Sequence, residues 1–166
     1  MADQPTDPSF GPATIRGVPI TVMAQYLKDL SFESPGAPAT IGVATELREG
    51  SVNVDVKVVP LSGPNYEVVL RVRVEANHEN KVIYLLEMEY GGLVQIGDVA
   101  AETVEPILMI EGPRLLFPYA RSIVTSMTRD GGFAPLLINP IDFAAMYRDF
   151  KRKNREAAAA ATANRP

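Results

Sequence analysis

Hydrophobic and polar residues alternate strictly in two stretches of the first half of the chain. In residues 51–58 (SVNVDVKV) the valines share one side of an extended chain and the polar residues share the other. The same period of two recurs in residues 66–76 (YEVVLRVRVEA). This pattern is typical of strands with one face on a core and one in solvent. We therefore predict two half-buried strands joined by the turn Ser-Gly-Pro-Asn at residues 62–65.

Two more strands flank this pair in the sequence. Residues 19–32 are apolar and β-favouring, and they end at Pro35-Gly36-Ala37-Pro38, where prolines stop the ladder and predict a turn or crossover. A fourth strand is predicted at residues 82–96, after a hairpin loop at residues 77–80. Gly91 and Gly92 inside it predict a bulge or bend. The last three strands, joined by short turns, imply an antiparallel meander.

The second half of the chain has helical periodicity. Asp98 is the expected cap of a short first helix, with Glu102 and Glu105 near its start. Pro106 and Gly112-Pro113 predict a break, followed by a longer helix over residues 113–128. Its apolar stripe consists of Leu116, Ala120, Ile123, Val124 and Met127.

Two glycines and a proline mark the last boundaries. Gly131-Gly132 end the long helix, and after Asn139-Pro140 a final helix is expected from Ile141 to about Lys153. The apolar side of that helix consists of Phe143, Ala144, Met146, Tyr147 and Phe150.

Strands followed by helices indicate an α+β fold, here a four-stranded antiparallel sheet followed by two main helices. We expect a disordered arm at residues 1–19, one domain over residues 20–153, and a flexible Ala-rich tail at residues 154–166. The apolar content of 46% and the long sheet edges exceed what one chain buries, so self-association is expected.

Composition narrows the function. The chain has no cysteine, which excludes disulfides, thiolate metal ligands and thiol nucleophiles. No secretory signal is expected at the N-terminus, and no apolar run reaches the length of about 20 residues that spans a bilayer. The net charge is −4, and the basic run is at residues 148–155. We favour a solvated helix end for that run over phosphate or membrane contact. Neither nucleic-acid binding nor membrane insertion is expected.

Candidate catalytic groups are sparse. The single histidine, His78, lies beside Glu79 and is either a general base or metal ligand or, as we favour, an exposed turn residue. Asp55 and the pair Glu87 and Glu89 supply carboxylates, but residues two apart on a strand are more typical of a solvated face. No phosphate-binding glycine loop or nucleophile elbow occurs. We expect no enzyme, metal or cofactor, and an enzymatic or small-ligand-binding domain is the less favoured alternative.

Acidic residues are the most distinctive surface feature. Asp29 and Glu33 lie four apart on a strand and share a face. With Glu87 and Glu89 they form either a docking surface for a basic partner or ordinary solubilising charge.

Three blocks of sequence carry a family resemblance. They are AQYLKDLSFESPGAP at residues 24–38, YEVVLRVRV with LLEMEYGG at residues 66–74 and 85–92, and PRLLFPYARSIVTSM at residues 113–127. In this order they closely resemble the SecB family of bacterial protein-export chaperones. The resemblance implies a cytoplasmic, ATP-independent homotetramer, built as a dimer of dimers. It would bind unfolded preproteins and deliver them to the SecA ATPase. A SecB-like chaperone serving a toxin–antitoxin system is the alternative.

The resemblance also implies binding residues. The SecA-binding surface would consist of Asp29, Glu33, Leu85 and Glu87. An apolar groove for preproteins would involve the crossover, the sheet edge and the long helix, with Tyr26, Phe32, Tyr119 and Phe133 as candidates. The alternative for each aromatic residue is a place in the core or in a subunit interface.

Overall fold

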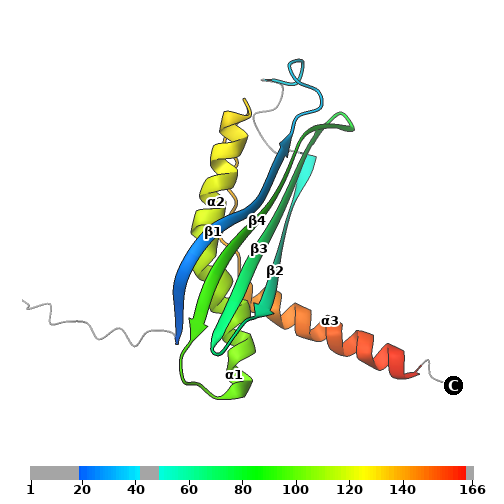
Figure 1. The fold of residues 1–166 in the computed structure, drawn as a ribbon. Coiled ribbons are helices and arrows are strands. Elements are labelled where there is room, and N and C mark those ends of the chain that lie inside the picture. The colour runs from blue at the N-terminus through cyan, green and yellow to red at the C-terminus, as the bar shows by residue number, and fades with distance from the viewer. Residues whose placement is uncertain (1–18, 42–48, 164–166) are drawn as a thin grey trace, which may run out of the picture.

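The computed structural model describes residues 19–41 and 49–163 (Figure 1). The expected arm at residues 1–19 therefore lies, apart from Pro19, outside the described residues. Four antiparallel strands form one sheet with the order β1-β4-β3-β2. The strands are β1 (Ile20–Glu33), β2 (Glu49–Pro60), β3 (Asn65–His78) and β4 (Lys81–Ile96). The predicted α+β fold with a four-stranded antiparallel sheet is confirmed.

The predicted meander of three strands is confirmed as β2-β3-β4, and β1 pairs with β4, so that β1 and β2 are the two edges. The loop between β3 and β4 is shorter than the predicted residues 77–80, because β3 continues to His78. Glu79 and Asn80 have φ values of 49° and 61°. Two successive left-handed residues make the hairpin turn that matches the twist of the flanking strands.

The helices are α1 (Ala101–Pro106), α2 (Gly112–Asp130) and α3 (Phe143–Ala163), and a π-helical turn, η1 (Ile107–Glu111), joins the first two. The predicted break between α1 and α2 is therefore wrong. The Gly112 N–H bonds back five residues to the Ile107 carbonyl, and this wider turn keeps the backbone helical. Pro113 lies in the first turn of α2, as predicted, where its missing N–H costs little.

Two helix ends differ from the sequence prediction. Asp98 does not cap α1, because the helix starts later, with Ala100 as its N-cap and no side-chain cap. The Ala100 carbonyl instead accepts bonds from the Thr103 N–H and hydroxyl, at 2.9 and 2.7 Å. The predicted end near Lys153 is also wrong. α3 continues through the alanine run and extends away from the sheet (Figure 1), since alanine is the strongest helix former.

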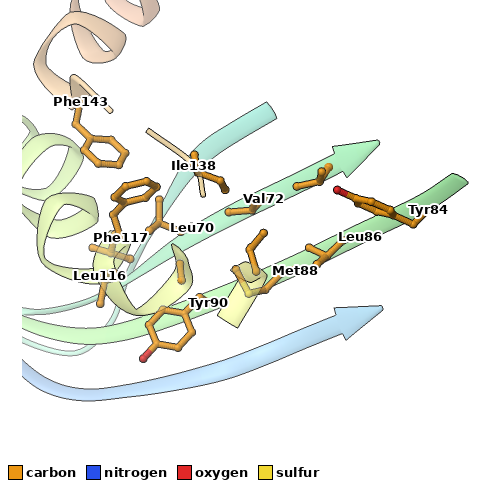
Figure 2. Packing of buried hydrophobic residues seen from close by; sticks show 14 of the residues in the cluster. Leu70, Val72, Tyr84, Leu86, Met88, Tyr90, Leu116, Phe117, Ile138 and Phe143 are labelled. Atoms are coloured by element: carbon orange, nitrogen blue, oxygen red, sulfur yellow. The ribbon is translucent and has the colours of Figure 1, made fainter. Parts of the chain in front are cut away.

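The core lies between α2 and one face of the sheet. Every fourth residue of α2 from its start is buried, namely Gly112, Leu116, Ala120, Val124 and Thr128. Side chains of β3 and β4 such as Leu70 and Leu86 face this stripe and are fully buried (Figure 2). Phe143 at the start of α3 packs edge-on against Phe117, with ring centroids 5.9 Å apart.

Gly91 and Gly92 do not form the predicted bulge. They pair regularly with Tyr26 and Gln25, and the irregularities in the pairing lie in β1, around Met23 and Lys28. The glycines instead allow close approach on both sides of β4. A Cβ at Gly92 would lie 2.7 Å from Leu116 Cδ2, and one at Gly91 would lie 2.6 Å from the Tyr26 ring.

Candidate binding surfaces

The sheet face opposite α2 carries rows of charged residues, and we call it the acidic face. Strand pairing aligns these rows across all four strands. In the order β1, β4, β3, β2, one row is Asp29, Glu89, Arg71 and Asp55, the next is Ser31, Glu87, Arg73 and Asn53, and the third is Glu33, Leu85, Glu75 and Ser51. A hollow of about 360 Å³ lies among the first two rows.

The structure brings the four residues of the predicted SecA-binding surface together on the acidic face. Asp29 and Glu33 on β1 are exposed, and Leu85 and Glu87 on β4 are half-buried. Glu33 is directly opposite Leu85 in the strand pairing. Their shared position follows from the period of two in each strand, and their role in binding SecA stays a prediction.

Arginines of β3 neutralise part of this face. Arg71 Nε lies 2.7 Å from Glu89 Oε1, and Arg73 Nη1 contacts Glu87 Oε1. Within the described part of the chain, Asp29, Glu33 and Asp55 have no ion pair. The sequence shows that Arg71 and Arg73 share a face of β3, but it does not give the register that sets them against the acids of β4.

Tyr26 also belongs to the acidic face. Its hydroxyl donates a 2.6 Å hydrogen bond to Glu67 Oε1, and Lys28 Nζ lies 2.9 Å from the same oxygen. Burial and the neighbouring carboxylate raise the pKa of Tyr26 to about 12. The hydrogen bonds from Tyr26 and Lys28 lower the pKa of Glu67. Tyr26 is therefore held in a polar network, on the opposite side of the sheet from the core.

The other three aromatic candidates for preprotein binding occupy two further places. Phe32 and Phe133 pack with Tyr84, with ring centroids 5.0–6.2 Å apart in this cluster. Phe133 and Tyr84 are buried, and burial raises the pKa of Tyr84. Tyr119 is 54% exposed on the outer side of α2. Within this chain the four aromatic candidates thus lie in three separate places, and their role in binding preproteins stays a prediction.

An apolar groove follows the β2 edge of the sheet beneath α3, and we call it the edge groove. It consists of adjoining hollows of about 530 and 310 Å³ that share Val56, Met109 and Phe150. Its apolar lining comes from Val54, Val56, Val58, Tyr66, Val104, Leu108, Met109, Met146, Tyr147 and Phe150. β2 has no strand partner on this side among the described residues. The sequence placed Phe150 on an apolar helix side, but Met109 had no signal of its own.

A contact between α1 and α3 lies beside the edge groove. Lys151 Nζ lies 2.9 Å from Glu105 Oε2 and 5.8 Å from the centre of the Tyr147 ring. The hydrogen bond to Glu105 raises the pKa of Lys151. Tyr147 and Phe150 lie on the same helix as Lys151 and line the groove beside this contact.

The other candidate catalytic and metal-binding residues do not come together in one site. His78 ends β3 with its side chain 49% exposed, and its Nε2 lies 4.0 Å from Glu79 Oε1. In residues 19–41 and 49–163, no group of three His, Asp or Glu side chains has a spacing that would hold a metal ion. No helix within these ranges is both long and apolar enough to cross a bilayer.

Comparison with known proteins decides the family. The family model for the preprotein translocase subunit SecB matches residues 15–154. The chain belongs to the SecB family. A protein-export protein SecB from Parvibaculum lavamentivorans is 44% identical over 87% of this chain and 86% of its own length. A SecB from Maricaulis maris, also named a protein-export protein, is 39% identical over 99% of this chain and 95% of its own.

A solved structure agrees with the fold. The SecB-like chaperone of Mycobacterium tuberculosis, in complex with a peptide from the HigA1 antitoxin, superposes with a TM-score of 0.59. The match covers 74% of this chain and 89% of that one, at 14% sequence identity. At this identity the likeness concerns the fold alone.

Proposed function

We propose that this SecB protein is a cytoplasmic, ATP-independent export chaperone that holds unfolded preproteins and delivers them to SecA. The edge groove is the observation that supports the binding of unfolded preproteins. It combines a sheet edge, whose backbone groups can pair with an extended chain, with an apolar trough beside it. Backbone pairing is independent of sequence. The combination therefore suits client proteins of different sequence that are unfolded and expose apolar residues.

The holding function needs no reaction. A protein that binds only the unfolded state of a client withdraws that state from folding and aggregation by mass action. The edge groove is open along β2 and shaped by flexible side chains such as Met109 and Met146. Methionine adapts its shape to different partners, which favours tolerance of many client sequences.

SecA would dock on the acidic face, through Asp29, Glu33, Leu85 and Glu87. On β2 the groove is lined by Val54, Val56 and Val58, which face the core side of the sheet and alternate with Asp55, a residue that borders both the groove and the acidic face. Because the SecA residues lie on β1 and β4, client and SecA would bind at opposite edges and mainly on opposite faces of the sheet. A chaperone that delivers its client requires such an arrangement, because both partners must be bound at once.

We further propose the family's homotetramer, a dimer of dimers. Leu115 and Tyr119 lie one turn apart on α2 and are 41% and 54% exposed. At the free β1 edge, Met23 and Leu27 are 57% and 45% exposed. Large apolar side chains on two adjoining exposed elements favour burial against other copies of the chain.

Phe150→Asp tests the groove. Phe150 is 42% exposed, so the substitution costs little folding free energy while it places a charge in the groove. We expect it to abolish protection of a chemically unfolded preprotein from aggregation, followed by light scattering, and to leave SecA affinity intact. Leu137→Asp is the matched control, since Leu137 is 64% exposed and is not in the groove lining. Full protection by the Phe150 variant would refute the assignment.

A further inference from the structure

Arg73 lies among the carboxylates of the acidic face. Its Nη1 contacts Glu87 Oε1, and its Nη2 lies 3.7 Å from Glu75 Oε2. Arg73 and Glu87 are directly opposite each other in the pairing of β3 with β4. The guanidinium therefore covers the carboxylate that would otherwise extend the negative charge of β1 toward the centre of the sheet.

The acidic residues of β1 differ from those of β4 in that they have no arginine partner on the neighbouring strand. Asp29 is opposite Glu89, and Glu33 is opposite Leu85, so neither faces a cation across the strand pair. Both are exposed, and in the described part of the chain neither has an ion pair. Glu87 and Glu89 each have an arginine partner on β3. Uncompensated negative charge thus gathers at the β1 side of the face.

We propose that Arg73 is a specificity-determining residue of the acidic face: it masks Glu87, so that a basic partner surface contacts Asp29 and Glu33 first and reaches Glu87 only by displacing Arg73. This rests on the proposed docking of SecA to the acidic face. The partner chemistry is a patch of lysine or arginine side chains, for which the Arg73 guanidinium is an intramolecular competitor.

The competition is weak enough to be reversible. The side chains of Arg73 and Glu87 are 49% and 47% exposed. Exposed ion pairs contribute so little that displacing Arg73 lowers the partner's affinity by only about two- to fivefold. Arg73 thus changes which acids contribute to docking without preventing it.

The experiment measures SecA affinity by titration calorimetry with the full chain. In the natural sequence we expect Asp29→Asn to weaken binding at least about threefold and Glu87→Gln to weaken it less than about twofold, because Asp29 has no ion pair among the described residues whereas Glu87 is paired with Arg73. Arg73→Gln should tighten binding about two- to fivefold. When Arg73→Gln is already present, Glu87→Gln should weaken SecA binding by about the factor that Arg73→Gln gained. The effects of the two substitutions on affinity are then not additive.

Arg71→Gln is the matched control. It removes the same charge from the same strand but releases Glu89 instead of Glu87. Equal tightening by both arginine variants would mean that overall charge matters and would overturn the role of Arg73. Equal losses from Asp29→Asn and Glu87→Gln would overturn it without any change at Arg73. If SecA fails to bind the natural chain, the proposed docking fails with it. If SecA binds and Asp29 matters but Arg73 does not, this inference alone fails.

Discussion

Tyr26 on β1 and Glu67 on β3 are joined by a 2.6 Å hydrogen bond although β4 lies between their strands. The bond is possible because Tyr26 pairs with Gly91, where the absence of a side chain lets the phenol ring lie across β4. Glycine weakens a strand, and an aromatic ring laid over it restores packing. The tyrosine, glycine and glutamate thus form one unit that spans three strands.

This unit makes stability depend on pH at both extremes. The lowered pKa of Glu67 means that its contribution is present above its ordinary pKa of 4.5 and is lost as the pH falls below it. The pKa of Tyr26 is raised from 10.0 to about 12, so its contribution is complete below pH 10 and is lost as the pH rises toward 12.

We therefore expect Glu67→Gln to reduce the loss of unfolding free energy between about pH 7 and pH 3.5, measured by urea titration. Tyr26→Phe should cost about 0.5–1.5 kcal/mol at neutral pH, the usual contribution of one hydrogen bond, and should reduce the alkaline loss. Arg114→Gln is a control that should change neither the acid loss nor the alkaline loss, because it breaks a pair between Arg114 at the start of α2 and Glu111 at the end of η1, away from this unit. If Glu67→Gln lost as much unfolding free energy on acidification as the natural chain, the role of Glu67 in acid stability would be contradicted.

The two neighbouring glycines should respond differently to alanine. A Cβ at Gly92 would meet Leu116, a fully buried residue of α2, so that the helix must move. Overpacking of this kind costs about 1–3 kcal/mol. A Cβ at Gly91 would meet the exposed Tyr26 ring, which can rotate away and loses at most its hydrogen bond to Glu67, about 0.5–1.5 kcal/mol. Both substitutions change the unfolded chain equally, so the difference in unfolding free energy reports the folded state. Equal costs would argue against tight packing at Leu116.

The strands were predictable because alternation directly encodes which face is buried. Val54 and Val72, for example, face the core as their patterns predict. The continuity of α1, η1 and α2 was not predictable. Pro106 and Gly112 are strong local signals for a break, and they are outweighed where η1 and α2 pack against the sheet. The end of α3 differs for another reason: a low-complexity alanine run is typical of a flexible tail, but the helix propensity of alanine extends the helix through it.

The acids of the candidate site were predictable and their partners were not. Asp29 and Glu33 share a face by spacing alone, but the pairing of Arg73 with Glu87 depends on the register of β3 against β4. The edge groove was not predicted. The family resemblance implies a groove at the crossover, the sheet edge and the long helix, and none of its candidates Tyr26, Phe32, Tyr119 and Phe133 lines the edge groove. Its lining combines residues from β2, η1 and α3, and no local pattern links Val56, Met109 and Phe150.

The exposed side of α2 should control assembly. We expect the double substitution Leu115→Asp and Tyr119→Asp to convert the proposed tetramer into a smaller species, because charges at a buried apolar contact are costly. The monomer fold should survive, since both side chains are already exposed. Native mass spectrometry and far-ultraviolet circular dichroism test the two points. Leu61→Asp, in the turn after β2, is the control, and an unchanged mass in the double variant would place the interface elsewhere.

The segment that leads from α2 to α3 is held by two threonines. Leu136 donates its N–H to Thr128 Oγ1 at 2.9 Å, and its carbonyl accepts a bond from Thr125 Oγ1 at 2.8 Å. Thr128 is fully buried, and its hydroxyl in turn lies 3.1 Å from the Val124 carbonyl. Both backbone groups of Leu136 are therefore bonded to the side chains of α2.

Thr128→Val should destabilise the chain by about 1–3 kcal/mol, because it leaves the partly buried Leu136 N–H without its acceptor. Thr128→Ser keeps the hydroxyl and loses only a methyl group, at a cost of about 0.8 kcal/mol. Hydrogen exchange separates the two effects. The Leu136 amide should exchange faster in the valine variant and at the natural rate in the serine variant, relative to global unfolding. If both variants protect that amide equally, another acceptor replaces Thr128, and the threonine serves only to fill space beneath the connecting segment.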